Sequence, residues 1–378
     1  MTTRPPTIDN GSRGVRAART VDRGVLLCYD ANEVSDRSPG SNLPVTTTCL
    51  YRDVSSPIVT VILPAKDAGP YIGTTVTTLG RQFQDPGRLR LVVIDDGSTD
   101  DTRVQVQHFA RDMPHVEIIS NPQPVGLAAA RNQGLERVDT EFFCFVDGDD
   151  WMHPERLESL IASMRRLECD FVRTDHVTDT DGRRRLMRAP HAWRGRAVSP
   201  REAILPADET TMVDYPYAWA GMFHRRILDQ GLAHFEPGLF TAEDRPWIWR
   251  LHLRAASFAV VDAPAILYRR GVTTSLTQVL DRRQLDFLPA FAEAIRVVED
   301  DHDADRFLPK IATTTMSVCA YHLFRARAMS TADRTALRSG IRDLLRAIPA
   351  DQIDPALSRL SDRRRRILAR LVREVRSA

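Results

Sequence analysis

Short apolar runs alternate with longer amphipathic segments between residues 58 and 168. The runs are IVTVIL (58–63), LRLVVI (89–94), VEIIS (116–120) and EFFCFV (141–146). Each is followed by a segment of helical length, for example YIGTTVTTLGRQ after the first run and PERLESLIASMRRLE after the last. Because strand and helix alternate, the pattern predicts an α/β fold, in which helices cover both faces of a mostly parallel sheet.

The chain divides into three parts by composition. Residues 1–55 are rich in Arg, Asp, Ser, Thr and Pro, and we expect a flexible leader there. Residues 56–278 carry the alternation of strands and helices and are expected to form the main α/β domain. Residues 279–378 are rich in Arg and place apolar residues such as Leu337 and Ile341 at helical spacing. This spacing predicts a separate helical region at the C-terminus, packed on the main domain or on another subunit of a homo-oligomer.

The composition argues against several classes of partner. The 378 residues include 52 Lys and Arg against 50 Asp and Glu, so the net charge of +2 creates no field that would attract nucleic acid. No apolar run approaches the roughly 18 residues of a membrane helix, and the first residues lack the apolar core of a signal peptide. We therefore expect a cytoplasmic protein that does not bind nucleic acid.

Acidic residues follow the predicted strands at the positions where open parallel sheets bind ligands. Asp95 and Asp96 follow the second strand, and Asp147, Asp149 and Asp150 follow the fourth. Three carboxylates this close repel one another unless a cation or a proton shares them. A hard divalent ion, Mn2+ or Mg2+, held together with a diphosphate suits a strand-end Asp-x-Asp. The sequence thus predicts a site for a metal ion and a phosphate-bearing ligand.

A second interpretation is that these aspartates only cap the helix expected near Pro154. Other phosphate and metal motifs do not fit. The chain has no GxxxxGK[ST] loop, no GxGxxG after the first strand and no GxSxG elbow. An EF-hand fails because Trp151 occupies the fifth loop position and no glycine follows at the sixth. The sequence therefore does not indicate an ATPase or a dehydrogenase.

Five motifs resemble glycosyltransferase family 2, the large inverting family with the GT-A fold. In order along the chain they are TVILPAKD, VVIDDGSTDDT, GLAAARNQG, FVDGDDW and TAEDRPWIWRL. The resemblance implies a GT-A nucleotide-sugar-binding fold for residues 56–278, followed by the C-terminal helical segment. It also implies an enzyme that moves a single sugar from a nucleotide sugar, expected to be a UDP-sugar, to an acceptor hydroxyl.

The resemblance further implies roles for individual residues. Asp149 would be the principal ligand of Mn2+ or Mg2+, and Asp244 would be the general base. Glu243 and Trp219 would lie on the acceptor side. The residues implied to bind the donor are Pro64, Ala65, Asp67, Asp96, Asn121, Arg131, Asp147, Gly148, Arg270 and Ser275.

Each assignment has a structural alternative. The acids that follow the second strand could form a plain turn in which Ser98 caps the next helix. Glu243 and Asp244 could be two exposed acids at the start of a helix. Trp219 could fill the core, as large aromatic side chains mostly do. The chain also departs from the family at Asp67, where asparagine is more frequent, and at Ala242, where glycine is frequent.

No motif identifies the acceptor, and a glycan, a lipid-linked molecule or a small molecule would each fit. Synthesis of cell-surface or wall polysaccharide is the expected pathway, and glycosylation of a secondary metabolite is the alternative. A sugar-phosphate nucleotidyltransferase and a non-catalytic scaffold that binds sugar nucleotides are competing interpretations. The terminal segment SDRRRRILARLVREVRSA (361–378) is either a basic helix that contacts anionic lipid at the inner face of the membrane or a helix packed on the core.

Overall fold

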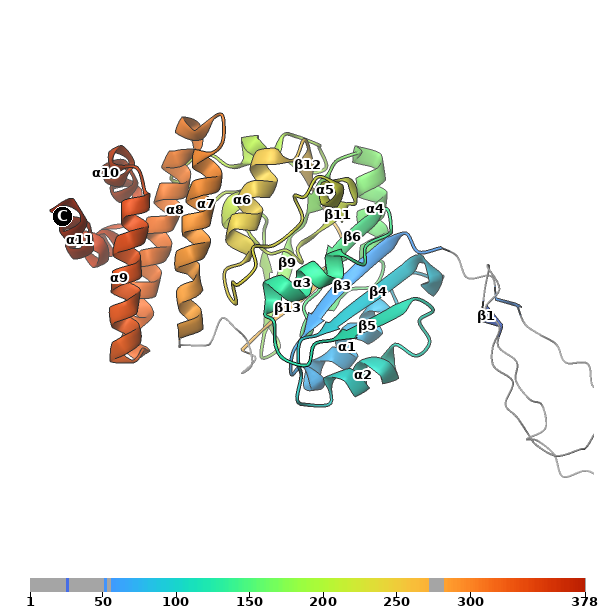
Figure 1. Ribbon diagram of the computed structural model, residues 1–378. Coiled ribbons are helices and arrows are strands. Elements are labelled where there is room, and N and C mark those ends of the chain that lie inside the picture. The colour runs from blue at the N-terminus through green and yellow to red at the C-terminus, as the bar shows by residue number, and fades with distance from the viewer. Residues whose placement is uncertain (1–24, 27–50, 53–55, 272–281, 378) are drawn as a thin grey trace, which may run out of the picture. The chain divides into compact units, whose positions relative to one another are not determined.

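The computed structural model describes residues 25–26, 51–52, 56–271 and 282–377 (Figure 1). The chain forms two compact units, Met1–Ser56 and Pro57–Ala378. In the first, strands β1 (Val25–Leu26) and β2 (Tyr51–Arg52) form an antiparallel pair. The rest of the expected leader lies outside the described residues. All features below belong to the second unit. The expected division of that unit near residue 278 remains a prediction.

A seven-stranded sheet forms the centre of this unit, with the strand order β12-β8-β11-β6-β3-β4-β5. The strands are β3 (Val59–Ala65), β4 (Leu89–Asp95), β5 (Val116–Ser120), β6 (Phe142–Phe145), β8 (Phe171–Arg173), β11 (Gly221–His224) and β12 (Phe258–Val260). Strand β11 pairs antiparallel with β6 and β8, and the other neighbouring pairs of this sheet are parallel. The expected mostly parallel sheet is therefore confirmed.

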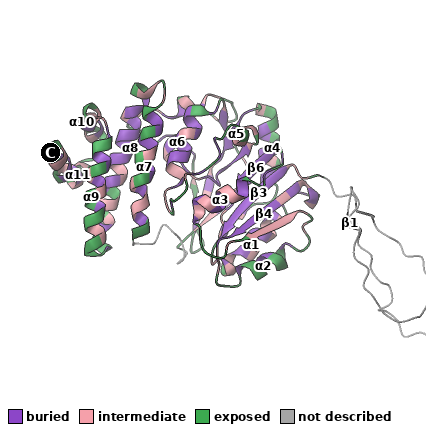
Figure 2. Cartoon of the chain, in the orientation of Figure 1, coloured by how far each residue is buried: buried purple, intermediate pink, exposed green. Residues whose placement is uncertain are grey.

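Helices cover the sheet. They are α1 (Gly69–Leu79), α2 (Thr102–Phe109), α3 (Leu127–Leu135), α4 (Arg156–Leu167), α5 (Arg226–Asp229) and α6 (Asp244–Arg254). Every residue of β3 is buried, as Figure 2 shows, and side chains alternate between the faces of a strand, so both faces are covered. On one face α3 approaches β3 so closely that a Cβ on Gly134 would lie 2.3 Å from the side chain of Ile62.

A second, four-stranded sheet lies at the end of β6. Its order is β10-β9-β13-β7, and its strands are β7 (Trp151–Met152), β9 (His176–Thr180), β10 (Arg183–Met187) and β13 (Ile266–Arg270). Asp181 and Gly182, both with positive φ, form the two-residue turn between β9 and β10. Strand β13 pairs with both β9 and β7, so it brings a late segment of the chain beside the acidic strand end after β6.

In residues 282–377, the described part of the C-terminal region, five α-helices follow one another (Figure 1): α7 (Phe287–Glu299), α8 (Ala304–Arg325), α9 (Thr331–Ala347), α10 (Ala350–Arg359) and α11 (Asp362–Arg376). Short 3-10 turns are η2 (Pro86–Arg88), η3 (Pro200–Ala203), η4 (Met212–Asp214), η5 (Arg282–Asp286) and η6 (Ala326–Ala328). Leu337 and Ile341 are buried, as their spacing predicts. Helix α7 packs against α6, so the helical region lies directly beside the α/β part.

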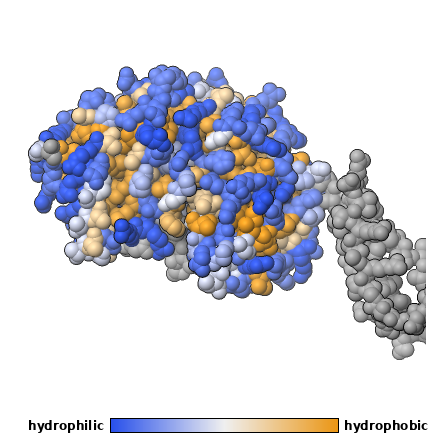
Figure 3. All heavy atoms as spheres, in the orientation of Figure 1, coloured by the Kyte–Doolittle hydropathy of each residue, from blue (hydrophilic) through white to orange (hydrophobic). Residues whose placement is uncertain are grey.

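The terminal helix α11 packs on α8 and α9. Leu368, Leu371 and Val372 are buried in that contact, which leaves the basic side chains outward. Figure 3 shows hydrophilic residues, in blue, along the outer edge of the C-terminal helices. The helix is thus packed through its apolar side, and contact of its basic side with anionic lipid stays a prediction. None of the described helices has both the length and the apolar character required to cross a bilayer.

Candidate active site

A cavity of about 980 Å³ lies at the carboxyl ends of β3, β4 and β6. The cavity lining includes Pro64, Ala65, Asp67, Asp96, Arg131, Asp147, Gly148, Asp149, Trp219, Glu243, Asp244 and Arg270. The topology therefore gathers into one cavity nearly all residues that the motifs single out, although they span two hundred positions of the chain. Asn121 does not line this cavity. Ser275 lies outside the described residues.

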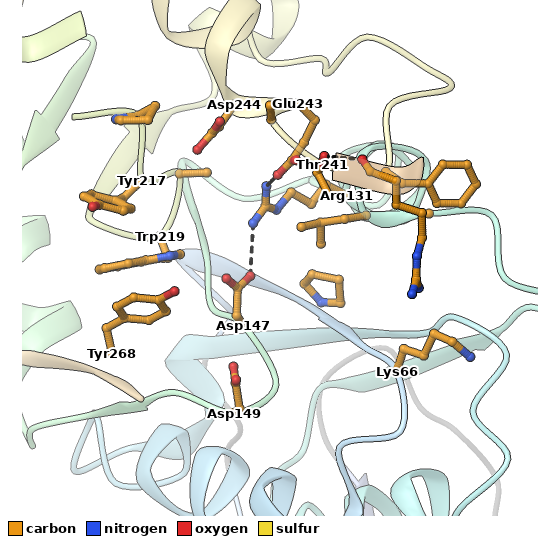
Figure 4. Close-up of a pocket in the computed structure, with 18 of the residues that line it drawn as sticks. Lys66, Arg131, Asp147, Asp149, Tyr217, Trp219, Thr241, Glu243, Asp244 and Tyr268 are labelled. Atoms are coloured by element: carbon orange, nitrogen blue, oxygen red, sulfur yellow. Dashed lines mark hydrogen bonds and ion pairs between the residues drawn. The ribbon is translucent and has the colours of Figure 1, made fainter. Parts of the chain in front are cut away.

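Arg131 lies at the centre of the site (Figure 4). Its guanidinium donates to Glu243 Oε1 at 2.6 Å and to Asp147 Oδ1 at 3.0 Å. The side chain is only 3% exposed, so both ion pairs are largely shielded from water. Arg131 thus joins the strand end after β6 to the start of α6.

The three acids after β6 separate into two environments. Asp147 and Asp149 line the cavity, whereas Asp150 is fully buried beneath it. Asp150 Oδ1 accepts from the backbone N–H of Arg269 at 2.9 Å, and its second oxygen has no protein partner. Burial raises the pKa of Asp150 well above its usual range, and its two acidic neighbours raise that pKa further. A proton on Asp150 would relieve part of the repulsion that the sequence predicts, and a cation at the other two acids would relieve the rest.

The residues present fit a divalent ion. Burial raises the pKa of Asp149 to about 6, and the nearby charge of Asp147 adds to the rise. Figure 4 shows the two carboxyl groups in the same cavity. Two carboxylates beside open space suit Mn2+ or Mg2+, which complete their coordination with phosphate oxygens and water. None of the three aspartates caps α4, because its N-cap is Glu155, which makes no side-chain cap hydrogen bond.

Asp301 and Asp303 form another acidic group together with His302, before α8. Both aspartates are already paired with Arg201, at 2.7 Å and 2.8 Å. These residues do not line the cavity. Their arrangement anchors α8 to the α/β part through Arg201 and does not add to the candidate active site.

Asp96 connects two loops at the edge of the cavity. Its carboxylate accepts from the backbone N–H groups of Val125 and Gly126 at 2.8 Å and 2.9 Å. It also accepts from the side-chain amide of Asn121 at 3.0 Å. Asn121 does not line the cavity itself, and it contributes to this edge of the site by orienting the Asp96 carboxylate. The role of Asp96 toward a nucleotide base stays a prediction.

Asp67 adopts a left-handed backbone conformation, with φ of 47°. Asparagine and aspartate tolerate this conformation better than other residues with side chains, which explains how either can occupy the position. Asp67 Oδ1 accepts from the backbone N–H of Thr99 at 2.8 Å, and the Asp67 N–H donates to Ser98 Oγ at 3.0 Å. The expectation that Ser98 caps the next helix is wrong, because its hydroxyl binds Asp67 and the N-cap of α2 is Asp101.

Glu243 and Asp244 differ in exposure. Glu243 is buried against Arg131, and burial raises its pKa to about 7 although Arg131 opposes the rise. Asp244 begins α6 and lies on the cavity wall, with Arg245 at 3.8 Å. Burial raises the pKa of Asp244 above its usual range, while Arg245 and Arg131 lower it. Ala242 precedes the pair with a positive φ of 60°, the conformation that glycine adopts most readily.

An aromatic wall faces Asp147 across the cavity (Figure 4). Trp219 stacks on Tyr268 with ring centroids 5.1 Å apart, and Tyr217 lies 5.0 Å from Trp219 on the other side. His176 meets Trp219 edge-on at 4.9 Å. Trp219 is only 4% exposed, so it is a core residue that also lines the cavity.

Several lining residues come from regions without a recognised motif. Tyr217 and Tyr268 each lie two residues before a residue that the resemblance singles out, Trp219 and Arg270 respectively. The residues of α7 and α8 that complete the lining have no such neighbour in the sequence. They are Phe287, Phe291, Val318, Tyr321, His322 and Arg325.

Comparison with known proteins shows which family this part of the chain resembles. Residues 60–232 match the model of Glycosyl transferase family 2. The uncharacterized glycosyltransferase EpsJ of Bacillus subtilis is 23% identical over 233 residues, which cover 61% of this chain and 66% of EpsJ. TuaG of Bacillus subtilis, a glycosyltransferase named for teichuronic acid biosynthesis, is 31% identical over 115 residues, which cover 30% of this chain and 45% of TuaG. The chain thus spans less than two thirds of these curated relatives.

The fold is similar to that of solved structures. The crystal structure of S. aureus TarS 1-349 in complex with UDP-GlcNAc matches with a TM-score of 0.67 and 17% identity. The match covers 84% of this chain and 92% of that chain, so it includes much of the C-terminal helical region. The expected GT-A fold with a C-terminal helical segment is confirmed.

Proposed function

We propose that the chain, whose residues 60–232 match the model of glycosyltransferase family 2, moves a single sugar from a nucleotide sugar to an acceptor hydroxyl. The proposed donor is a UDP-sugar, and the configuration at the anomeric carbon inverts. The observation that carries the proposal is one cavity that holds Asp147 and Asp149 at a strand end and Asp244 on the opposite wall.

In the proposed reaction Asp244 accepts the proton of the acceptor hydroxyl. The acceptor oxygen forms a bond to the anomeric carbon while the bond from that carbon to the diphosphate oxygen breaks. The electron pair of the broken bond leaves with the diphosphate. A base whose pKa lies above that of an ordinary aspartate is better matched to this proton transfer near neutral pH.

The donor end of the cavity is proposed to lie around Asp149. Asp149, with Asp147 beside it, would hold Mn2+ or Mg2+, and such an ion would neutralise charge on the departing diphosphate. Pro64, Ala65 and Asp67 would line the nucleotide, since they follow β3 at the edge of the same cavity. Arg131 binds both Asp147 and Glu243, and it thereby connects the donor side of the cavity to the acceptor side.

Two comparisons support the finer parts of the proposal. The TarS structure that shares this fold contains UDP-GlcNAc, which favours a UDP-sugar as the donor. The name of TuaG refers to the biosynthesis of teichuronic acid, which favours a cell-surface or wall polysaccharide as the pathway.

A thermal-shift and turnover screen tests the proposal. Purified protein is heated with UDP-, dTDP- and GDP-sugars, each with and without Mn2+. The proposal expects that UDP-sugars raise the melting temperature, that the rise requires the metal, and that slow hydrolysis of the same donor is detected. The absence of binding by every nucleotide sugar, with metal present, would contradict it.

A further inference from the structure

The cavity continues past Asp244 onto the C-terminal helices. Asp244 lies 3.8 Å from Arg245, whose guanidinium lies over the ring of Phe291 on α7 at 5.9 Å. Phe287, one turn earlier on α7, stacks flat on His322 of α8, with centroids 3.9 Å apart. The contacts therefore run in order from the proposed base to α7 and then to α8.

Arginine dominates the charge of this extension. Its described charged side chains beyond Glu243 and Asp244 are Arg245, Arg283 and Arg325. No carboxylate besides those two lines the described part of the cavity on α6, η5, α7 or α8. The acids of the donor end, Asp147 and Asp149, instead lie on the far side of Arg131. The extension thus presents three arginines beside Glu243 and Asp244, whereas the donor end presents Asp147 and Asp149, which suit a metal.

The position of Arg325 is held by its neighbours. Its guanidinium donates to the hydroxyl of Tyr321 at 3.0 Å and lies 5.6 Å from the centroid of the same ring. Burial lowers the pKa of His322 to about 4, and Arg325 and Arg245 lower it further. The imidazole of His322 is therefore neutral at neutral pH. The positive charge at this end of the cavity comes from the arginines.

We infer that the acceptor is anionic: it carries a phosphate or carboxylate group that Arg325 and Arg245 bind while its hydroxyl lies at Asp244. The inference rests on the proposed function. Arginine is suited to both anions because its planar fork can donate two parallel hydrogen bonds. The apolar faces of Phe291 and Val318 in the same lining suit the carbon skeleton of such an acceptor.

The test uses matched pairs of small probes. With UDP and Mn2+ saturating the donor end, glycerol phosphate is compared with glycerol, and glucuronic acid with glucose, by calorimetric or NMR titration. The inference expects at least one charged probe to bind about tenfold or more tightly than its neutral partner. The pair that shows the preference tells phosphate from carboxylate. Equal affinity within both pairs would overturn the inference.

Single substitutions show which arginine causes the preference for the charged probes. Arg325→Gln is expected to remove it and Arg325→Lys to retain part of it, because the lysine keeps the charge but not the fork. Arg327→Gln is the matched control, since Arg327 is exposed and lies outside the cavity. A preference that survives in Arg325→Gln would overturn the inference. The comparison of probes in the unmodified protein stands even where a variant melts at a lower temperature.

The same titration separates this inference from the proposed function. UDP that binds with Mn2+ while the charged probes show no preference leaves the proposed function intact and overturns the anionic acceptor alone. Failure of UDP to bind overturns both.

Discussion

Arg131 and Glu243 form a buried ion pair of 2.6 Å between residues 112 positions apart in the chain. The second bond of Arg131, to Asp147, makes this pair the link between the strand end after β6 and the first turn of α6. Both partners of Arg131 are acids of the candidate site, so this arginine connects the strand end that carries the proposed metal ligands to the residue that precedes the proposed base.

Replacement of Arg131 by glutamine should destabilise the protein strongly. The substitution leaves Glu243 buried without its counter-ion, and breaking such a pair typically costs about 3–5 kcal/mol of the free energy of unfolding. Chemical denaturation measures the loss. Arg137→Gln is the control, because Arg137 is about half exposed and its pair with Glu117 lies at the surface. An equal loss of the free energy of unfolding in the two variants would contradict this prediction.

The acid limb of the pH–rate profile should move when Arg245 is replaced. Arg245 lowers the pKa of Asp244, so its removal raises that pKa. The proposed base must be deprotonated, so activity is lost as pH falls through this pKa. Arg245→Gln should therefore shift the acid limb of donor hydrolysis to higher pH. Arg254→Gln, an exposed change at the other end of α6, should leave the limb in place. A limb that moves equally in both variants, or in neither, would argue against Asp244 as the titrating group.

His252 should make the protein less stable in mild acid. Burial lowers its pKa in the folded state to about 3, against 6.5 for the ordinary group. Between these values the unfolded chain binds a proton that the folded chain does not, so the free energy of unfolding falls as pH drops below about 6.5. His252→Phe should flatten the dependence of melting temperature on pH in that window. His234→Gln, at an exposed position, should not, and equal slopes in all three proteins would contradict the account.

Lys310 should be required for the attachment of α8. Its buried ammonium donates to Asp214 Oδ2 at 2.5 Å and to the carbonyl of Glu209 at 2.6 Å. Lys310→Ala leaves the Asp214 carboxylate without its counter-ion, with an expected loss of about 3–5 kcal/mol by urea denaturation. The pair of Lys66 with Asp67 is partly exposed, and Lys66→Ala should cost at most about 1 kcal/mol. Comparable losses would mean that burial of the Lys310 pair is unimportant.

The sheet and its acidic strand ends could be predicted from local patterns. The run at 58–63 corresponds to β3, which the structure extends to Pro64 and Ala65. The helix expected at 71–82 begins two residues earlier and ends at Leu79, before Gly80. Pro70 suits the first turn, where its missing N–H is not needed, which explains the earlier start. Such differences are small because apolar periodicity reports directly on burial.

Residues brought together over long distances in the chain could not be predicted in this way. Residues 310–316 of α8 are all buried, but nothing in their sequence says which elements cover them. The placement of Tyr321 and Arg325 in the cavity depends on the packing of α7 against α6 and of α8 against α7. Likewise, nothing in the motif of Arg131 indicates that its partner is Glu243.

The most direct measurement compares Asp149→Ala and Asp244→Asn in UDP binding and in turnover, with Mn2+ present. The proposed function predicts that Asp149→Ala abolishes the metal-dependent stabilisation by UDP. It predicts that Asp244→Asn binds UDP as the unmodified protein does and loses turnover by about 100-fold or more, as expected for loss of a general base. Turnover that persists in Asp244→Asn, or UDP binding that is unchanged in Asp149→Ala, would contradict the central claim that the cavity joins a metal-bound donor to this base.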